Sequence, residues 1–199
     1  MKKLNKGAIV AIGGASTIAS TKSIDRVTVA LAEKRRRHKG KLRLLYVPTA
    51  RYDERQTYQE KSDYFIQEFG CTVKALILTK KDNRSFEIKA LVRWADIIYV
   101  GGGNTRYMME MWRRNGVDTC IARAYRRGAI LTGMSAGSLC WFKGGWSDAE
   151  DIEGYVPWYP VLVNGLGLIE AWHSPHFNEE GWRKKKTAKG PEGVTIAID

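Results

Sequence analysis

Two short apolar runs, each followed at once by a cluster of glycines, most constrain the fold of this chain. Residues 97–100 read Ile-Ile-Tyr-Val and lead into Gly-Gly-Gly-Asn, and residues 129–132 read Ala-Ile-Leu-Thr and lead into Gly-Met-Ser-Ala-Gly. A continuous apolar run of this kind is typical of a strand buried on both faces of a parallel sheet. Because a helical pattern separates the two runs, they predict a strand–helix–strand unit with a glycine turn after each strand.

The remainder of the chain continues this alternation. Further strands are expected at residues 8–12, 42–47 and 73–78, and helices at 23–37, from 53 or 57 to 69, and at 85–93, 105–114, 117–126 and 136–142. The pattern predicts an α/β fold with a mostly parallel sheet and helices on both faces. Sites in such sheets form beyond the carboxyl ends of the strands, so the two glycine turns are expected to meet in space.

The pattern weakens beyond residue 143. Residues 144–159 are rich in glycine, acidic and aromatic residues and are expected to form a loop or irregular segment over the site. A strand is expected at 166–171 and another at 194–198, where the sequence stops. The length of 199 residues fits one domain, and we expect a single domain over residues 1–199 that is truncated at its C-terminus.

Residues 133–137 fit the pattern G-x-S-x-G, the nucleophile elbow. In that motif a serine, here Ser135, lies on a tight turn between a strand and a helix with its hydroxyl exposed. Side chains in place of the glycines would clash with the neighbouring strand and helix. A glycine-rich turn that merely contains a serine explains five residues equally well, because short motifs recur by chance. The interpretation therefore depends on finding a base, an orienting acid and donors for an oxyanion.

The chain supplies candidates for each of these groups. His173 and His176 follow an expected strand and can face the serine, whereas His38 lies in a basic helix end. Four carboxylates lie between the serine and the two histidines: Asp148, Glu150, Asp151 and Glu153. The backbone N–H of Ala136 and a glycine amide in residues 101–103 are candidate oxyanion donors. No Lys-Ser/Thr pair follows the glycine run, which excludes a phosphate-binding Walker loop.

Composition restricts the partners and the compartment. The formal charge is +12, with basic runs at residues 34–39 and 183–186. Neither run has interleaved aromatics or a nucleic-acid motif, so we expect solvated surface and no nucleic-acid partner. The sequence lacks an apolar stretch of roughly 20 residues, so no membrane span is expected. Three widely spaced cysteines form no disulfide or metal pattern, which favours a reducing cytoplasm.

Several motifs occur in a characteristic order: Gly-Gly-Gly-Asn-Thr after a strand, Gly-Met-Ser-Ala-Gly-Ser with Cys-Trp-Phe, Trp-Ser-Asp, and Ser-Pro-His-Phe. Together they resemble the peptidase E family of serine peptidases, the aspartyl dipeptidases related to cyanophycinase. The resemblance extends from the first strand to Ile198. It implies a fold like class I glutamine amidotransferase domains, with serine in place of their cysteine, and a hydrolase that needs no cofactor and no metal.

The resemblance also implies roles for individual residues. Ser135 matches the nucleophile, and His176, in Pro-His-Phe, matches the base. Asp148 is the best match to the acid, with Glu150 and Asp151 as reserves, because the family often has Asp-Ser where this chain has Asp-Ala. Gly102, Gly103 and Ala136 fall at the positions of the oxyanion hole.

The function expected from these residues is a serine exopeptidase that cuts short peptides, including those with an N-terminal Asp, through an acyl-enzyme. Arg51, Arg106 and Lys143 are conceivable partners for a substrate carboxylate. Two other functions stay open: an esterase of the α/β-hydrolase type, which shares the elbow, and an inactive or regulatory binding module of the same fold. Assembly into a homo-oligomer is also open.

Overall fold

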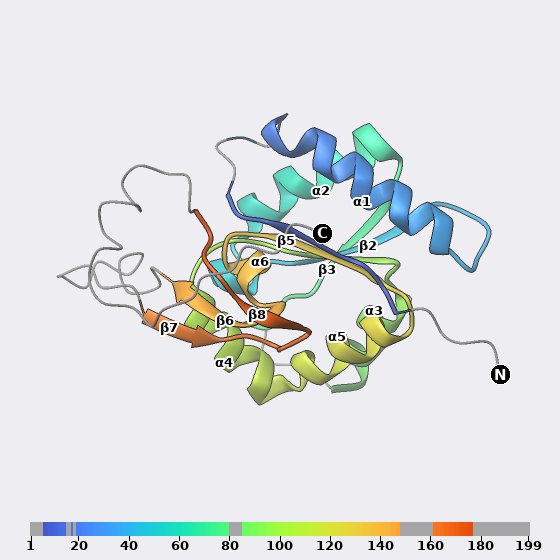
Figure 1. Ribbon diagram of the computed structural model, residues 1–199. Coiled ribbons are helices and arrows are strands. Elements are labelled where there is room, and N and C mark those ends of the chain that lie inside the picture. The colour runs from blue at the N-terminus through green and yellow to red at the C-terminus, as the bar shows by residue number, and fades with distance from the viewer. Residues whose placement is uncertain (1–5, 15–16, 18, 80–84, 148–160, 177–199) are drawn as a thin grey trace.

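A five-stranded parallel sheet forms the centre of the molecule (Figure 1). The computed structural model describes residues 6–14, 17, 19–79, 85–147 and 161–176. Its strand order is β1-β5-β4-β2-β3, and all four neighbouring pairs are parallel. The strands are β1 (Ile9–Ile12), β2 (Arg43–Val47), β3 (Thr72–Ala75), β4 (Ile97–Val100) and β5 (Ile130–Met134).

Helices cover both faces of this sheet. The helices are α1 (Lys22–Arg35), α2 (Arg55–Phe69), α3 (Ser85–Trp94), α4 (Thr105–Asn115), α5 (Val117–Arg126) and the short α6 (Ala136–Leu139), with 3-10 turns η1 (Ala19–Thr21) and η2 (Thr49–Arg51). In Figure 1, α1 and α2 lie on one face, and α3, α4 and α5 on the other. The predicted α/β architecture with a parallel sheet is confirmed.

The central strands are the most buried part of the fold. All four residues of β4 and the last four of β2 are buried, as continuous apolar runs predict. One core cluster packs α3, α4 and α5 against the sheet, and a second packs α1 and α2 against the other face. Burial of Met108, Met109 and Trp112 anchors α4, consistent with the expectation that this apolar stripe is core.

A second, three-stranded sheet was not predicted. It consists of β6 (Phe142–Ser147), β7 (Val161–Asn164) and β8 (Ile169–His173), in the order β7-β6-β8. The expected helix at 136–142 therefore ends at Leu139, the expected irregular segment begins with a strand, and the strand expected at 166–171 is shifted to 169–173. The strand expected at 194–198 and most of the expected loop lie outside the described residues.

The glycines of β6 explain why this strand was missed. Glycine is depleted in strands, so Gly144 and Gly145 argued for a loop. In the structure a Cβ on Gly145 would collide with the carbonyl group of His173, its partner in β8. The absence of a side chain lets the two backbones approach, which a propensity argument cannot detect.

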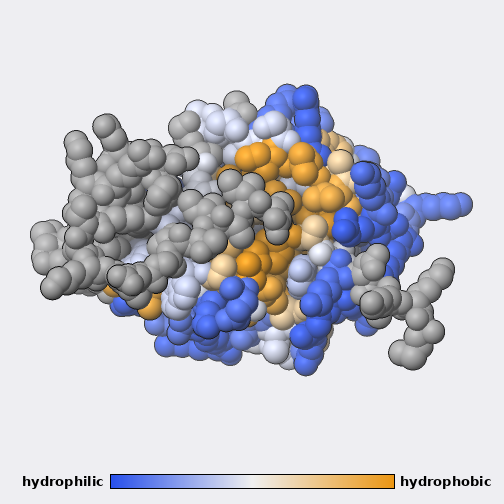
Figure 2. All heavy atoms as spheres, viewed as in Figure 1, coloured by the Kyte–Doolittle hydropathy of each residue, from blue (hydrophilic) through white to orange (hydrophobic). Residues whose placement is uncertain are grey.

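Apolar and hydrophilic residues separate on the surface. Figure 2 shows apolar side chains gathered in the middle of the viewed face, where β1 runs in Figure 1, with hydrophilic residues around them. Strand β1 is an edge strand of the sheet, and three of its four residues are at least partly exposed. Within the described parts of the chain, every helix is too short or too polar to cross a bilayer.

The parallel register of β4 and β5 brings the two glycine turns together. Val100, the last residue of β4, lies opposite Gly133 in β5. A Cβ on Gly133 would lie 2.7 Å from the carbonyl oxygen of Val100, and a Cβ on Gly137 would lie 2.7 Å from its carbonyl carbon. The close approach of the β5 turn, α6 and the end of β4 therefore requires glycine, as the sequence predicted.

This packing gives a test by matched glycine substitutions. Gly137→Ala must push apart rigid backbone, and we expect it to lower the free energy of unfolding by about 2 kcal/mol or more. Gly13→Ala is the control, because the nearest atom to its added Cβ is 4.0 Å away, and a change within about 0.5 kcal/mol is expected. Urea unfolding measures both values, and equal losses would contradict this account of the elbow.

Candidate active site

Ser135 lies in a strained turn between β5 and α6. Its backbone has φ 55° and ψ −115°, in a region that residues other than glycine rarely adopt. The turn is held from both sides. The N–H of Ser135 donates to the carbonyl oxygen of Ile12 in β1 at 2.9 Å, and its own carbonyl oxygen accepts from the N–H of Ser138 at 2.9 Å. The geometry is that of a nucleophile elbow, with the serine partly exposed.

His176 lies directly against this serine. Its Nε2 is 2.8 Å from the Ser135 Oγ, a normal hydrogen-bond distance. His176 follows β8 after a short turn and also has a positive φ, 82°. Two non-glycine residues with unfavourable backbone conformations therefore meet at one hydrogen bond. Both side chains are partly exposed, so a ligand can reach them.

His173 makes a different contact. Its Nε2 is 2.8 Å from the Oγ of Ser138, and its ring stacks on Phe142 with centroids 4.5 Å apart. The hydroxyl of Ser138 donates its proton to the carbonyl oxygen of Ser135 at 2.7 Å. Because that proton is used, the His173 Nε2 carries a hydrogen and donates to Ser138. His173 and the buried Ser138 thus support the turn from behind, a connection that no sequence motif signalled.

The glycine turn after β4 lies beside the serine. A Cβ on Gly102 would be 3.2 Å from the Cβ of Ser135. Gly103 has φ 137°, and a Cβ there would collide with the carbonyl group of Ala50. Among the described residues, no acceptor is recorded for the backbone N–H groups of Gly102, Gly103 or Ala136. Gly102 and Gly103 are partly exposed, whereas Ala136 is buried.

Asn104 fixes the end of this turn. Its N–H donates to the carbonyl oxygen of Ala50 at 2.7 Å, and its side-chain oxygen caps α4 by accepting from the N–H of Tyr107 at 2.9 Å. The Gly-Gly-Gly-Asn sequence is therefore a strand end, a tight turn and a helix cap in succession. Asp148, Glu150 and Asp151, the candidate acids, lie outside the described residues.

The segment after β2 lies against the glycine turn and forms another wall of the site. Of this segment, the sequence argument proposed only Arg51 for the site. Tyr52 and Asp53 have positive φ values, 54° and 58°. The Oδ2 of Asp53 accepts from the N–H groups of Leu78 and Thr79 at 2.6 and 2.8 Å, while burial raises the pKa of this carboxyl group. Asp53 thereby holds the turn in place. From the sequence, Asp53 was considered only as a possible start of the next helix, which begins at Arg55, so this role was missed.

The three candidate carboxylate partners differ in their surroundings. A Cβ on Gly103 would be 3.0 Å from the Cγ of Arg51, so Arg51 lies beside the glycine turn. The Nζ of Lys143 is already paired with Glu170 at 2.7 Å. Arg106 is exposed on α4 and has an interaction of its own. Arg51 is therefore the best placed of the three.

The nearest cysteine is unsuited to act as a nucleophile. Cys140 is completely buried behind the turn, and its Sγ donates to the carbonyl oxygen of Gly137 at 3.2 Å. Burial raises the pKa of the thiol well above its ordinary value, so the thiol stays protonated at neutral pH. The described parts of the chain also contain no group of three or more His, Cys, Asp or Glu side chains arranged to hold a metal ion.

The sequence and the fold are similar to those of several peptidases. The uncharacterized peptidase YgaJ of Bacillus subtilis is 32% identical over 143 residues, which are 71% of this chain and 57% of that protein. Peptidase E of Salmonella gallinarum is 30% identical over 103 residues, 50% of this chain and 40% of that protein. The chain thus spans about half the length of these relatives.

Among solved structures, a peptidase from an acI-B1 Actinobacterium superposes with a TM-score of 0.70 over 91% of this chain and 72% of that one, at 20% identity. A putative peptidase E protein from Listeria monocytogenes gives a TM-score of 0.57 over 83% of this chain and 77% of that one, at 21% identity. Both share the fold. The model of peptidase family S51 matches residues 9–191, a range that contains the whole site described above, and the chain belongs to this family.

Proposed function

We propose that this chain is the catalytic part of a serine peptidase, with Ser135 as nucleophile and His176 as base. The observation that carries the proposal is the 2.8 Å contact between the Ser135 Oγ and the His176 Nε2 on a strained elbow. Membership of peptidase family S51 supports peptide hydrolysis as the reaction. The accessible hydroxyl and the buried, protonated Cys140 favour serine over cysteine.

In the proposed mechanism, the Oγ of Ser135 attacks the carbonyl carbon of the scissile peptide bond while the Nε2 of His176 takes its proton. The negative charge that develops on the carbonyl oxygen is stabilised by the N–H groups of Ala136 and of Gly102 or Gly103. His176 then gives the proton to the leaving amine, and the C–N bond breaks. Water, deprotonated by His176, hydrolyses the resulting ester and regenerates the serine.

The strained backbone has a role in this scheme. A serine at the tip of a tight turn projects its hydroxyl away from its own strand and helix, so that His176 and the donor amides can surround it. For its Nε2 to accept a proton, His176 must carry its hydrogen on Nδ1, which calls for an acceptor behind the ring. We propose Asp148 for that acceptor on the resemblance alone, with Glu150 and Asp151 as alternatives.

For the substrate, we propose short peptides with an acidic N-terminal residue. Arg51 lies at the glycine turn, and no ion pair is recorded for it among the described residues, whereas Lys143 is paired with Glu170. A guanidinium group binds a carboxylate through two parallel hydrogen bonds, which favours Asp over a neutral residue. The resemblance of the sequence motifs to the aspartyl dipeptidases is the second ground for this choice.

Substitution of the proposed nucleophile tests the mechanism. Ser135→Ala and His176→Ala are each expected to lower kcat for a peptide substrate by a factor of about 10⁴ or more. A fluorophosphonate probe should label Ser135 in the unmodified chain, and His176→Ala should strongly slow that labelling, because an unactivated serine reacts poorly. Mass spectrometry of the adduct identifies the site, and Ser85→Ala, an exposed serine at the start of α3, is the control.

Each alternative function has a distinct outcome in this experiment. An inactive binding module would show no labelling and no loss of activity in Ser135→Ala. An esterase of the α/β-hydrolase type would be labelled at Ser135 and hydrolyse activated esters, but would leave all dipeptides intact. Either result would overturn the peptidase proposal.

The substrate preference is tested separately with Arg51→Gln. This change should lower kcat/KM for Asp-Leu by about 10-fold to 100-fold relative to Ala-Leu, because it removes a charge-assisted pair and leaves the rest of the site in place. Lys143→Gln, which removes a cation already paired with Glu170, should leave the ratio of the two kcat/KM values unchanged. If Arg51→Gln lowered kcat/KM equally for both peptides, Arg51 would contribute to folding or to general substrate binding and not to the preference for Asp.

A further inference from the structure

A pocket of about 370 Å³ opens at the end of the sheet opposite the candidate active site. Its lining comes from four separate parts of the chain: the end of α1, the segment that leads into β2, the segment between α3 and β4, and the end of α5. Strands β4 and β5 begin here and end at Val100 and Met134, directly before Gly101 and Ser135. Strands of four to five residues span roughly 13–17 Å, so the two sites are independent.

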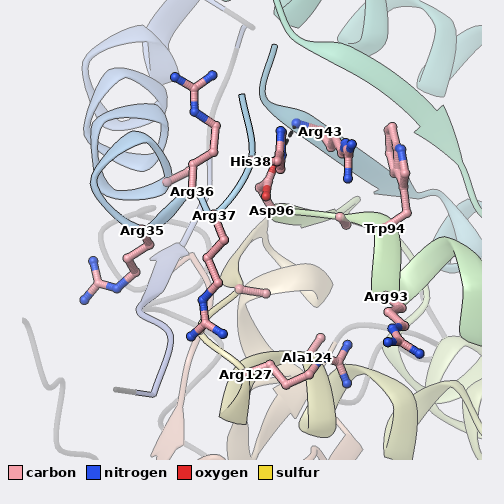
Figure 3. A pocket seen from close by; sticks show the side chains of 14 residues that line it. Arg35, Arg36, Arg37, His38, Arg43, Arg93, Trp94, Asp96, Ala124 and Arg127 are labelled. Carbon is pink, nitrogen blue, oxygen red and sulfur yellow. Dashed lines mark hydrogen bonds and ion pairs between the residues drawn. The ribbon is translucent and has the colours of Figure 1, made fainter. Parts of the chain in front are cut away.

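Arginine dominates this pocket. Six arginines line it, with one histidine and a single carboxylate: Arg35, Arg36, Arg37, Arg43, Arg93, Arg127, His38 and Asp96. Figure 3 shows that these side chains come from different elements, and that the guanidinium groups of Arg35 and Arg36 point away from the middle of the group. The end of the molecule where α1 stops is correspondingly hydrophilic in Figure 2.

The single carboxylate is already engaged. The Oδ2 of Asp96 lies 2.8 Å from the Nε2 of His38 and accepts from the N–H of Arg43 at 2.9 Å, as Figure 3 shows for the histidine contact. Asp96 therefore ties the segment before β2 to the start of β4, and it offers little to the arginine side chains.

Most of the arginine side chains lack an anionic partner within the described residues. Arg36 pairs with Glu33 at 2.9 Å and also donates to the carbonyl oxygen of Gly40. No ion pair among the described residues is recorded for Arg35, Arg37, Arg43, Arg93 or Arg127. Like charges gathered in a concave site repel one another, and a bound polyanion relieves that repulsion while the hollow concentrates the potential.

We propose that this pocket binds a small polyanion that carries two or more phosphate groups. Guanidinium groups present planar pairs of donors that match phosphate oxygens, and several of them on different elements can hold a chain of phosphates. The volume lies in the range of small-molecule sites. Trp94, partly exposed at the rim with Lys74 over its ring at 4.7 Å, offers one aromatic surface for a base or sugar.

The run at residues 34–39, interpreted from the sequence as solvated surface, contributes to the lining of this pocket. That run suggested a solvated helix end because its charges are contiguous in sequence. The fold adds Arg43, Arg93 and Arg127 from other segments to four of the six residues of the run, Arg35 to His38, which form one wall of the pocket. The proposal concerns a small ligand and does not depend on the peptidase activity.

The test is calorimetric titration of the intact chain with tripolyphosphate and, separately, with ATP, both without Mg²⁺ at 150 mM salt (about 8 Å screening length). We expect saturable binding at one site per chain. Equal affinities would mean that the phosphate chain alone is recognised, and tighter ATP binding would mean that the nucleoside also makes contacts. Arg37→Gln with Arg127→Gln should weaken binding by at least about tenfold.

Two further measurements distinguish binding in this pocket from non-specific attraction of an anion to the basic surface. Arg123→Gln changes an exposed arginine of α5 outside the pocket and should leave the affinity within about twofold. Ligand should change the intrinsic fluorescence, and Trp94→Phe should abolish most of that change while calorimetry still detects binding. Thermal unfolding checks that each variant is folded.

Four outcomes would overturn the proposal. The first two are the absence of any binding and binding that does not saturate. The others are a loss of affinity in Arg123→Gln as large as that in the Arg37→Gln, Arg127→Gln variant, and a fluorescence response that is unchanged in Trp94→Phe. Tighter binding of a single-stranded RNA oligonucleotide, weakened by the same pocket variants, would assign the arginines to nucleic acid and would also reject a small ligand.

Discussion

Strands β4 and β5 pair in parallel with Val100 opposite Gly133, so the turns that follow the two strands lie at the same edge of the sheet. This pairing determines where the rest of the candidate site can lie. It places the amides of the Gly-Gly-Gly turn beside Ser135, and it forces the elbow against the carbonyl group of Val100, where only glycine fits. Strand β1 completes the arrangement from the other side by accepting the N–H of Ser135 at Ile12.

The unfavourable backbone at Ser135 persists because its surroundings fix it on several sides. A positive φ at a non-glycine residue costs of the order of 1–3 kcal/mol. The opposing contributions are hydrogen bonds to β1 and within α6, and burial of the strands on which the turn is mounted. His176 lies in a similarly unfavourable conformation, so the contact between the two side chains depends on two independently supported turns.

Much of the main sheet could be predicted from the sequence, because its strands are buried on both faces and its helices have one apolar side. Residues 97–100 and 117–126 have the bounds that periodicity predicts. The second sheet could not be predicted, since Gly144 and Gly145 in β6 satisfy a steric requirement of partner strands rather than a strand propensity. The tight turn at Ser135 could be predicted from the local motif. The link from His173 through Ser138 could not, because hydrogen bonding between side chains 35 residues apart leaves no periodic signal.

His173, the last residue of β8, and His176, which follows the strand, are both positioned by the small sheet. His173 pairs with Gly145 in the small sheet, and His176 follows three residues later. A displacement of β8 would therefore withdraw the partner of Ser135 and the support of Ser138 in a single movement, while every strand of the large sheet kept its hydrogen bonds. The position of the small sheet therefore decides whether His176 lies against Ser135, whereas the large sheet positions Ser135 itself.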